Sequence, residues 1–177
     1  MNKTHVCCFT GHRPHKLPFL RDEDHPQYRL LEQRLTKEIL EKVLLHGCDT
    51  FLCGMAQGTD MLCAELILKL RVLIGEHLRL VCVIPYLAQA QRWDAAEQGR
   101  YKSILAQADR KILLGNEYTD GCLLARNRFL ADHSMHMIAV YDGISAGGTR
   151  YTLGYARRKD LSICVVDPNS LIPFSYE

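Results

Sequence analysis

Short runs of consecutive apolar residues recur along the chain, separated by longer segments of mixed polarity. The runs occupy residues 5–10, 50–53, 79–84, 111–114, 136–141 and 162–166. Apolar residues stand next to one another in these runs instead of alternating with polar ones, which is typical of strands covered on both faces. We therefore predict an α/β domain, with a Rossmann-like parallel sheet of about six strands and helices on both faces.

The segments between the runs carry helical periodicity. The predicted helices cover residues 28–46, about 61–73, 88–108, about 122–133 and about 149–159. The apolar stripe of the first helix is predicted to be Leu30, Leu31, Leu35, Ile39, Val43 and Leu44, and that of the second Leu62, Leu66, Leu70 and Leu73. Gly99 is a candidate weak point in the third helix, because glycine is a poor helix former.

Two segments outside these elements have a simpler interpretation. Residues 15–27 are polar, contain Pro18 and Pro26, and predict a long connection over the loop after the first strand. The short tail after Pro168 is expected to cap an edge of the sheet. The 177 residues, 47% of them hydrophobic, suit a single domain over residues 1–177.

Charge and cysteine usage narrow the class of protein. A net charge of +2 lacks the basic footprint of extended nucleic-acid binding, although it allows a local basic pocket. The polar N-terminus is unlike a secretory signal, and no apolar stretch approaches the roughly 18 residues of a membrane helix. The eight cysteines form no Cys-x-x-Cys pair. We expect a soluble, cytoplasmic protein with reduced, buried thiols, no metal site and no membrane partner.

The stretch Gly54-Met55-Ala56-Gln57-Gly58-Thr59-Asp60 lies between a predicted strand and a predicted helix. Its glycines let the backbone approach a ligand, and the start of the helix offers unpaired N–H groups that favour an anion. Asp60 stands where a helix cap or a first-turn carboxylate would stand. The alternative is an ordinary strand-to-helix connection.

Three more candidate loops leave predicted strand ends, where ligands bind in such sheets. Arg13 in Gly11–Pro14 is either aimed at a phosphate or carboxylate or is a solvated surface arginine. Tyr86 either stacks on a base or ribose or fills space under a loop. Asp142–Thr149 is rich in small residues and precedes the last predicted helix. His12 and His15 flank Arg13 and carry no specific signal.

Together these motifs resemble the SLOG superfamily, the Rossmann-like group named for the DNA-processing protein Smf/DprA and the cytokinin-activating LOG proteins. Phe9-Thr10-Gly11-His12-Arg13-Pro14 looks most like the DUF1273 branch, which includes the YpsA proteins. Gly54-x-Ala56-x-Gly58-x-Asp60 and Arg126-Asn127-Arg128 are similar to elements of DprA proteins, and Gly147-Gly148-Thr149 to the end of the LOG glycine loop. The resemblance covers about residues 5–166.

The resemblance implies a pocket for a nucleotide or nucleotide derivative. Its glycine loops would cradle phosphate, and Arg126 and Asn127 would bind the same group. The residues predicted to line this site are Gly11, Arg13, Gly54, Ala56, Gly58, Thr59, Asp60, Tyr86, Arg126, Asn127, Asp142, Gly147, Gly148 and Thr149. The resemblance to LOG proteins also implies a homodimer. No cofactor is expected.

One position departs from the LOG pattern. LOG hydrolases carry a glutamate three residues after the threonine of the glycine loop, and this position is Thr152 here. A glycosidic hydrolase needs a carboxylate, and threonine does not act as a base. Asp60 and Glu65 are the weak candidates for a substitute, with solvent-facing charge the competing interpretation of Glu65.

Three functional hypotheses follow. The first is a sensor or regulatory module that binds an ADP-ribose-like or NAD-like molecule without turnover. The second is a LOG-like phosphoribohydrolase that cleaves the N-glycosidic bond of a nucleotide. The third is single-stranded DNA binding as in DprA, against which the near-neutral charge argues.

Overall fold

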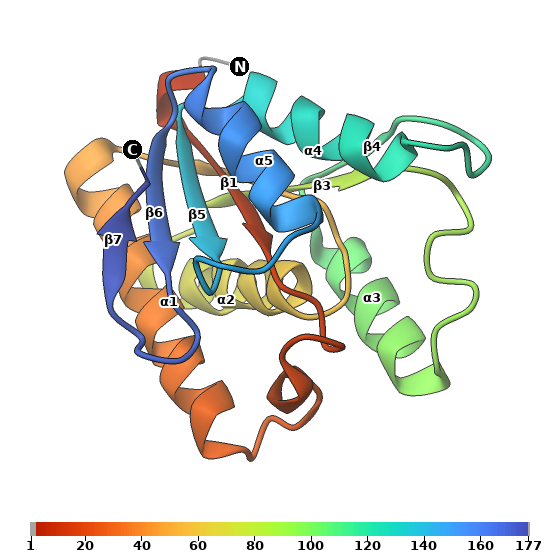
Figure 1. Cartoon of the computed structure of the whole chain (residues 1–177), viewed down its shortest axis with the longest axis horizontal. Helices are drawn as coiled ribbons and strands as arrows, with labels where there is room; N and C mark the ends of the chain where they lie inside the picture. The colour runs from red at the N-terminus through yellow and green to blue at the C-terminus, as the bar shows by residue number, and fades with distance from the viewer. Residues whose placement is uncertain (1–2, 177) are drawn as a thin grey trace.

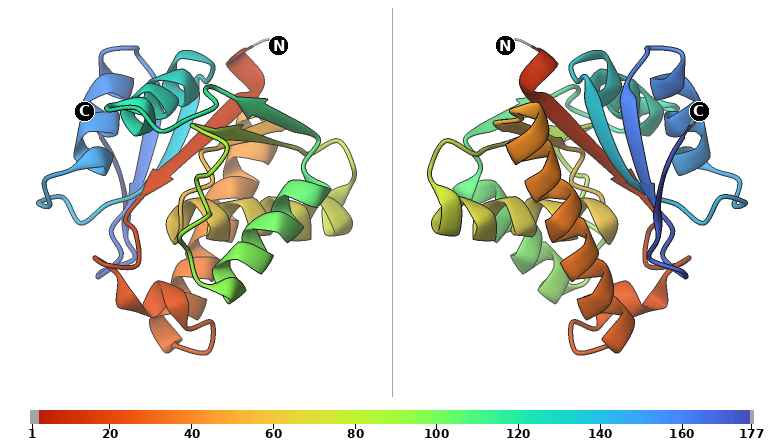
Figure 2. Two further views of the ribbon diagram at one scale, coloured as in Figure 1. Left: turned by 90° about the vertical axis from the view of Figure 1, so that its right-hand side faces the viewer. Right: turned by 90° about the vertical axis from the view of Figure 1, so that its left-hand side faces the viewer.

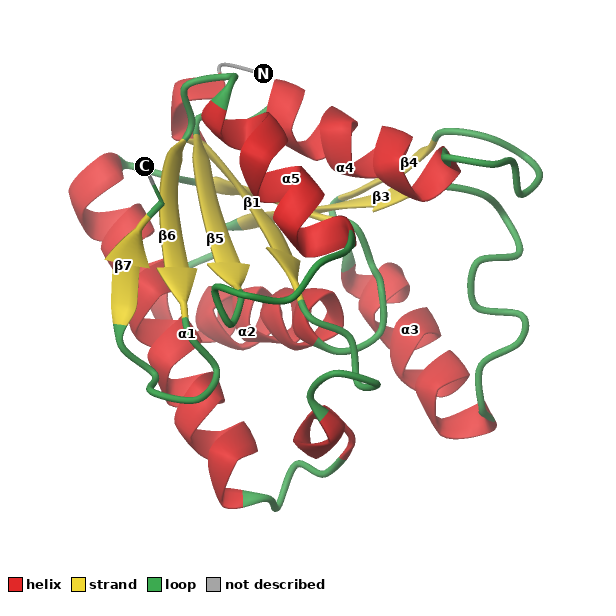
Figure 3. Cartoon of the chain, in the orientation of Figure 1, coloured by secondary structure: helices red, strands yellow, loops and turns green. Residues whose placement is uncertain are grey.

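The computed structural model describes residues 3–176, which form an α/β sandwich (Figures 1 and 3). The strands are β1 Val6–Gly11, β2 Thr50–Cys53, β3 Arg79–Ile84, β4 Arg110–Leu113, β5 His136–Val140, β6 Ser162–Val166 and β7 Pro173–Ser175. The α-helices are α1 Pro26–His46, α2 Thr59–Ile74, α3 Ala95–Gln107, α4 Cys122–Asp132 and α5 Gly148–Arg157, with short 3₁₀ helices at Lys3–His5 and Pro18–Arg21.

All strands belong to one sheet in the order β4-β3-β2-β1-β5-β6-β7. Every neighbouring pair is parallel except β6 and β7. The Rossmann-like parallel sheet is therefore confirmed, as is the prediction that the tail covers an edge. The seventh strand, β7, was not predicted because Pro173–Ser175 is short and has a single apolar residue between proline and serine.

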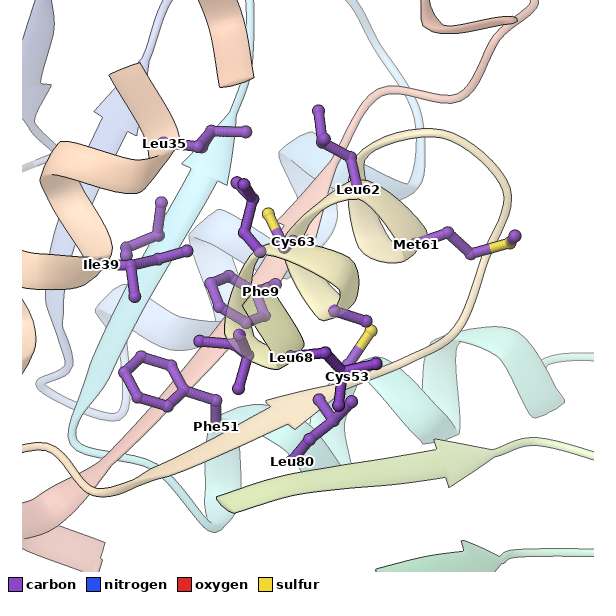
Figure 4. Packing of buried hydrophobic residues seen from close by; sticks show 14 of the residues in the cluster. Phe9, Leu35, Ile39, Phe51, Cys53, Met61, Leu62, Cys63, Leu68 and Leu80 are labelled. Carbon is purple, nitrogen blue, oxygen red and sulfur yellow. The ribbon is translucent and has the colours of Figure 1, made fainter. Parts of the chain in front are cut away.

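Helices cover both faces of the sheet. Figure 2 shows α1, α2 and α3 on one side and α4 and α5 on the other. Each face of the sheet has its own hydrophobic core. In the central strand β1, Cys7 and Phe9 belong to the core under α1, α2 and α3, and Val6 and Cys8 belong to the core under α4 and α5. The rings of Phe9 and Phe51 stack at 5.8 Å beneath α2 (Figure 4). Consecutive apolar residues in β1 are thus explained by two opposed cores.

The predicted apolar stripes are correct in the middle of each helix and wrong at the margins. In α1, Leu31, Leu35 and Ile39 are fully buried, but Leu30 and Leu44 are 49% and 74% exposed. The buried residues follow one i, i+4 line, and Leu30 and Leu44 lie to the sides of it. Leu73 of α2 is 77% exposed in the last turn.

Helix α3 begins at Ala95 instead of residue 88. Turns occupy the intervening residues, and the Asp94 side chain caps the helix by accepting a hydrogen bond from the backbone N–H of Glu97 at 2.9 Å. The helix runs unbroken through Gly99, so this residue does not interrupt it.

The eight cysteines are all free thiols, six of them buried. Burial raises the pKa of the Cys8 and Cys82 thiols to about 12. Within residues 3–176, none of the helices has the length and apolar character needed to cross a membrane.

Two glycines give opposite expectations for replacement by alanine. Gly58 has φ 87°, and an added Cβ would lie 2.9 Å from Cδ of Pro14, so Gly58→Ala should destabilise the fold by about 1–3 kcal/mol. Gly99 is exposed inside α3 with no atom within 4 Å of an added Cβ, so Gly99→Ala should stabilise it by about 0.5–1 kcal/mol. Urea unfolding of both variants measures the difference; equal effects would contradict the role assigned to Gly58.

Candidate functional site

A cavity of about 430 Å³ opens at the carboxyl ends of the central strands. It lies where the chain, having built β2, β3 and β4 on one side of β1, returns to the other side as β5. Figure 3 shows the loops after β1 and β5 side by side at this point. Its lining residues are Thr10, Gly11, His12, Arg13, His15, Lys16, Ala56, Asp60, Tyr118, Gly121, Leu123, Leu124, Arg126, Asn127, Ala146, Gly147, Gly148 and Thr149.

The loop after β1 is fastened to the start of α2. The Thr59 hydroxyl donates a hydrogen bond to the carbonyl oxygen of His12 at 2.9 Å, and Thr59 is 1% exposed. Neither Thr59 nor Gly58 lines the cavity. These two predicted ligand contacts therefore hold loops together, since the tight turn at Gly58 brings the second loop against the first.

Arg126 enters the cavity wall from α4 and is 3% exposed. Its Nη1 donates a hydrogen bond to the carbonyl oxygen of Gly54 and lies 3.5 Å from Oδ2 of Asp60. A Cβ on Gly54 would overlap this guanidinium, so glycine is required by the arginine and not by a ligand. Asp60 in turn accepts a hydrogen bond from the backbone N–H of Ala56 at 3.2 Å.

Asn127 connects Arg126 to α5. Its Oδ1 accepts from Nε of Arg126 at 2.8 Å, and its Nδ2 donates to the hydroxyl of Thr152 at 2.7 Å. That hydroxyl donates to the carbonyl oxygen of Gly148, also at 2.7 Å. Thr152 is 1% exposed and does not line the cavity. The position of the LOG glutamate is thus occupied here by a residue that fixes the first turn of α5.

Positive charge and free backbone donors meet on one wall. Helix α5 follows Gly147 and α4 follows Gly121, and neither helix has a side-chain cap. Lys16 donates a hydrogen bond to the carbonyl oxygen of Ala146 at 3.1 Å, beside the start of α5. Arg13 is exposed, lines the cavity and has no side-chain partner among the described residues. This wall can bind an anion through N–H groups and cationic side chains.

His12 and Asp142 form a pair at the base of the first loop. Nε2 of His12 lies 3.2 Å from Oδ1 of Asp142. Burial lowers the pKa of His12 below its ordinary value, against the opposing effect of Asp142. Burial raises the pKa of Asp142, but hydrogen bonds from Ser145, Ile144 and His12 outweigh it and hold the pKa well below its ordinary value. Asp142 therefore orders its own loop and does not line the cavity, whereas His12 does.

Tyr86 and Glu65 lie elsewhere. Tyr86 lines a smaller cavity that adjoins the first, with its ring edge-on to Tyr118 at a centroid distance of 5.4 Å. Glu65 lines a separate cavity between α1, α2 and α3. Both of its carboxylate oxygens accept hydrogen bonds from Arg100 at 2.6 Å. Glu65 therefore makes an ion pair with α3 and does not face the candidate site.

Sequence reasoning missed several lining residues, among them His12, Lys16, Tyr118, Leu123 and Leu124. Tyr118 follows β4, and its place after a predicted strand was the available signal. Asp60 is the one carboxylate among the described residues that line the cavity, and no group of three metal-binding side chains occurs within residues 3–176.

Comparison with known proteins agrees with the fold and the motifs. The YpsA family model, described as "YspA SLOG family", matches residues 7–171. YpsA of Bacillus subtilis is 25% identical over 156 residues, which cover 87% of this chain and 85% of that protein. A UPF0398 protein of Halalkalibacterium halodurans is also 25% identical over 156 residues, covering 87% of this chain and 81% of that one.

A prophage-derived relative has similar coverage. The SPbeta prophage-derived protein YoqJ of Bacillus subtilis is 28% identical over 149 residues, covering 76% of this chain and 84% of that protein. The family match spans nearly the whole α/β sheet and every loop of the cavity. The chain therefore belongs to the YpsA family of the SLOG superfamily.

Proposed function

We propose that the protein binds a nucleotide-derived ligand, of the ADP-ribose or NAD type, in the cavity at the carboxyl ends of β1 and β5, as a sensor or regulatory module. The observation that carries the proposal is that the uncapped start of α5 and Arg13, which has no side-chain partner among the described residues, line the same cavity. The volume of about 430 Å³ lies in the range of roughly 300–1,000 Å³ common for small-molecule sites.

Helices that begin at the cavity differ in their caps from two helices that begin away from it, and α2, whose Asp60 lines the cavity, also lacks a side-chain cap. His25 caps α1 and Asp94 caps α3 through side-chain hydrogen bonds, and both helices begin away from the cavity. The helices α4 and α5 begin at its wall with glycines and no side-chain cap. A bound phosphate would accept from the free N–H groups of α5, with Arg13 and Lys16 supplying charge.

The remaining wall suits the uncharged parts of a nucleotide. The carboxylate of Asp60 can accept hydrogen bonds from ribose hydroxyls, as acidic residues do in many Rossmann sites. Leu123 and Leu124 are half-buried, and Tyr118 is 57% exposed at the edge of the cavity. These side chains offer apolar and aromatic surface to a ring.

The site supports binding better than LOG-type hydrolysis. Thr152 is buried and has its hydroxyl engaged, so it neither contacts a ligand nor supplies a base. Asp60, the lining carboxylate, lies 3.5 Å from the Arg126 guanidinium. The Asp60 carboxylate also accepts a hydrogen bond from the backbone N–H of Ala56, so groups of the protein itself already engage it.

A thermal-shift screen with ADP-ribose, NAD and AMP, followed by product analysis, tests the proposal. We expect a ligand to raise the melting temperature and to be recovered unchanged. Recovery of free base and sugar phosphate would show that the protein is an N-glycosidic hydrolase and would refute the proposal of binding without turnover. Absence of a shift with all three compounds, confirmed by calorimetry, would refute the proposed ligand class.

Removal of the Arg13 charge should weaken phosphate binding. A charge-assisted hydrogen bond contributes about 1.5–3 kcal/mol, so Arg13→Ala should raise the dissociation constant about tenfold to a hundredfold. Arg21→Ala is the matched control, because Arg21 is also exposed but lines none of the three cavities. Titration calorimetry measures both variants; equal affinity loss in the two would show a general charge effect only.

A methyl group at the start of α5 should obstruct the ligand without harming the fold. Gly148 lines the cavity, and a Cβ built there meets nothing within 4 Å. We expect Gly148→Ala to keep the melting temperature and to lower ligand affinity at least tenfold. Gly154→Ala in the same helix is the control, since its Cβ makes only an ordinary contact at 3.7 Å. Unchanged affinity in Gly148→Ala would place the phosphate elsewhere.

A further inference from the structure

A second, smaller cavity of about 80 Å³ adjoins the candidate site. It is lined by Arg13, Ala56, Gln57, Tyr86, Gln89, Trp93, Leu123 and Arg126. Four of these residues, Arg13, Ala56, Leu123 and Arg126, also line the main cavity. A ligand in the main cavity can therefore extend into the smaller one, whose size suits the edge of a ring and not a whole nucleotide.

Gln89, one of the lining residues, carries an unusual polar group. Its side chain is more than nine-tenths buried, with 8% exposed. Nε2 donates a hydrogen bond to the carbonyl oxygen of Met55. Oε1 is buried and has no partner among the described residues. A buried carbonyl oxygen without a donor is costly, and such atoms usually have a protein, water or ligand partner.

The backbone at Met55 determines which way the Gln89 amide points. Met55 is fully buried and adopts φ 57°, a left-handed conformation that is uncommon for a residue with a side chain. Its backbone N–H donates to Sγ of Cys53, and its carbonyl oxygen receives Nε2 of Gln89. Rotation of the amide by half a turn would place two carbonyl oxygens together. The orientation of the Gln89 amide is therefore fixed, with Nε2 toward Met55 and Oε1 left without a donor.

We propose that the smaller cavity is a subsite for the amino-bearing edge of a nucleobase, with Oε1 of Gln89 accepting a hydrogen bond from an exocyclic amino group such as that of adenine. This inference rests on the proposed binding of a nucleotide-derived ligand. The half-buried rings of Tyr86 and Trp93 line the same space and provide surface for the base.

The subsite would discriminate between amino and oxo bases. A base with an oxygen in place of the amino group would bring an acceptor against Oε1 of Gln89, leaving both unpaired. Sites built to pair a buried polar group reject ligands that lack the partner more strongly than apolar pockets reject a change in size. The expected ligand class is thus an adenine-type nucleotide rather than its hypoxanthine counterpart.

The test compares two matched ligand pairs by titration calorimetry: ADP-ribose with its deaminated analogue, and AMP with IMP. We expect each amino ligand to bind the unmodified protein at least tenfold more tightly than its oxo counterpart. In Gln89→Met, which keeps the side-chain length and removes the acceptor, the ratio should fall to about one. Gln91→Met, at an exposed position that lines neither cavity, should keep the original ratio.

The possible failures are distinguishable. Equal binding of amino and oxo ligands to the unmodified protein would overturn the subsite and leave nucleotide binding intact, whereas no binding of any of the four would overturn both. If a folded Gln89→Met variant still binds the amino ligands more tightly than the oxo ligands, Gln89 does not recognise the amino group and its proposed role is refuted. If that variant does not fold, a crystal structure of the unmodified protein with AMP decides: the amino group on Oε1 supports the subsite, and a water there refutes it.

Discussion

The burial of one guanidinium group sets the shape of the candidate site. Arg126 of α4 is 3% exposed, and a buried cation is tolerated only when its N–H groups are paired. Its partners are the carbonyl oxygen of Gly54, the amide of Asn127 and, at 3.5 Å, the carboxylate of Asp60. Because these groups come from the loop after β2, from the first turn of α2 and from α4, the arginine joins separate parts of the cavity wall. Asn127 and Thr152 extend the same network to α5.

The polar residues in and around the site fall into two groups, according to whether they have hydrogen-bond partners within the protein. Residues with internal partners, such as Thr59, Asp142 and Thr152, hold the loops in place. Among the described residues, Arg13 has no side-chain partner and α5 has no side-chain cap, so these donors are open to the proposed ligand. A rigid frame around unpaired donors lowers the entropic cost of binding, which is a property expected of a selective binding site.

Thr152 shows why position in a family motif does not decide activity. It occupies the place of the LOG glutamate, but its hydroxyl lies between Asn127 and the Gly148 carbonyl oxygen, outside the cavity lining. Fold and loop positions are shared across the superfamily, whereas function depends on the chemistry at particular positions. The geometry agrees with the interpretation drawn from the residue type, because Asp60, the one lining carboxylate among the described residues, belongs to α2 and lies 3.5 Å from the Arg126 guanidinium.

The sequence by itself determined the parallel strands β1 to β6, the positions of the loops between them and the presence of the five α-helices. Runs such as Val6–Phe9 are buried on both faces, and that requirement leaves a local record in the order of residues. The sequence did not reveal that Leu30 and Leu73 are exposed or that Glu65 pairs with Arg100. It also did not reveal that His12 and Lys16 line the cavity. Only the tertiary structure decided these, because local periodicity specifies which side of an element is apolar but not which neighbour, distant in the chain, covers or pairs with a given side chain.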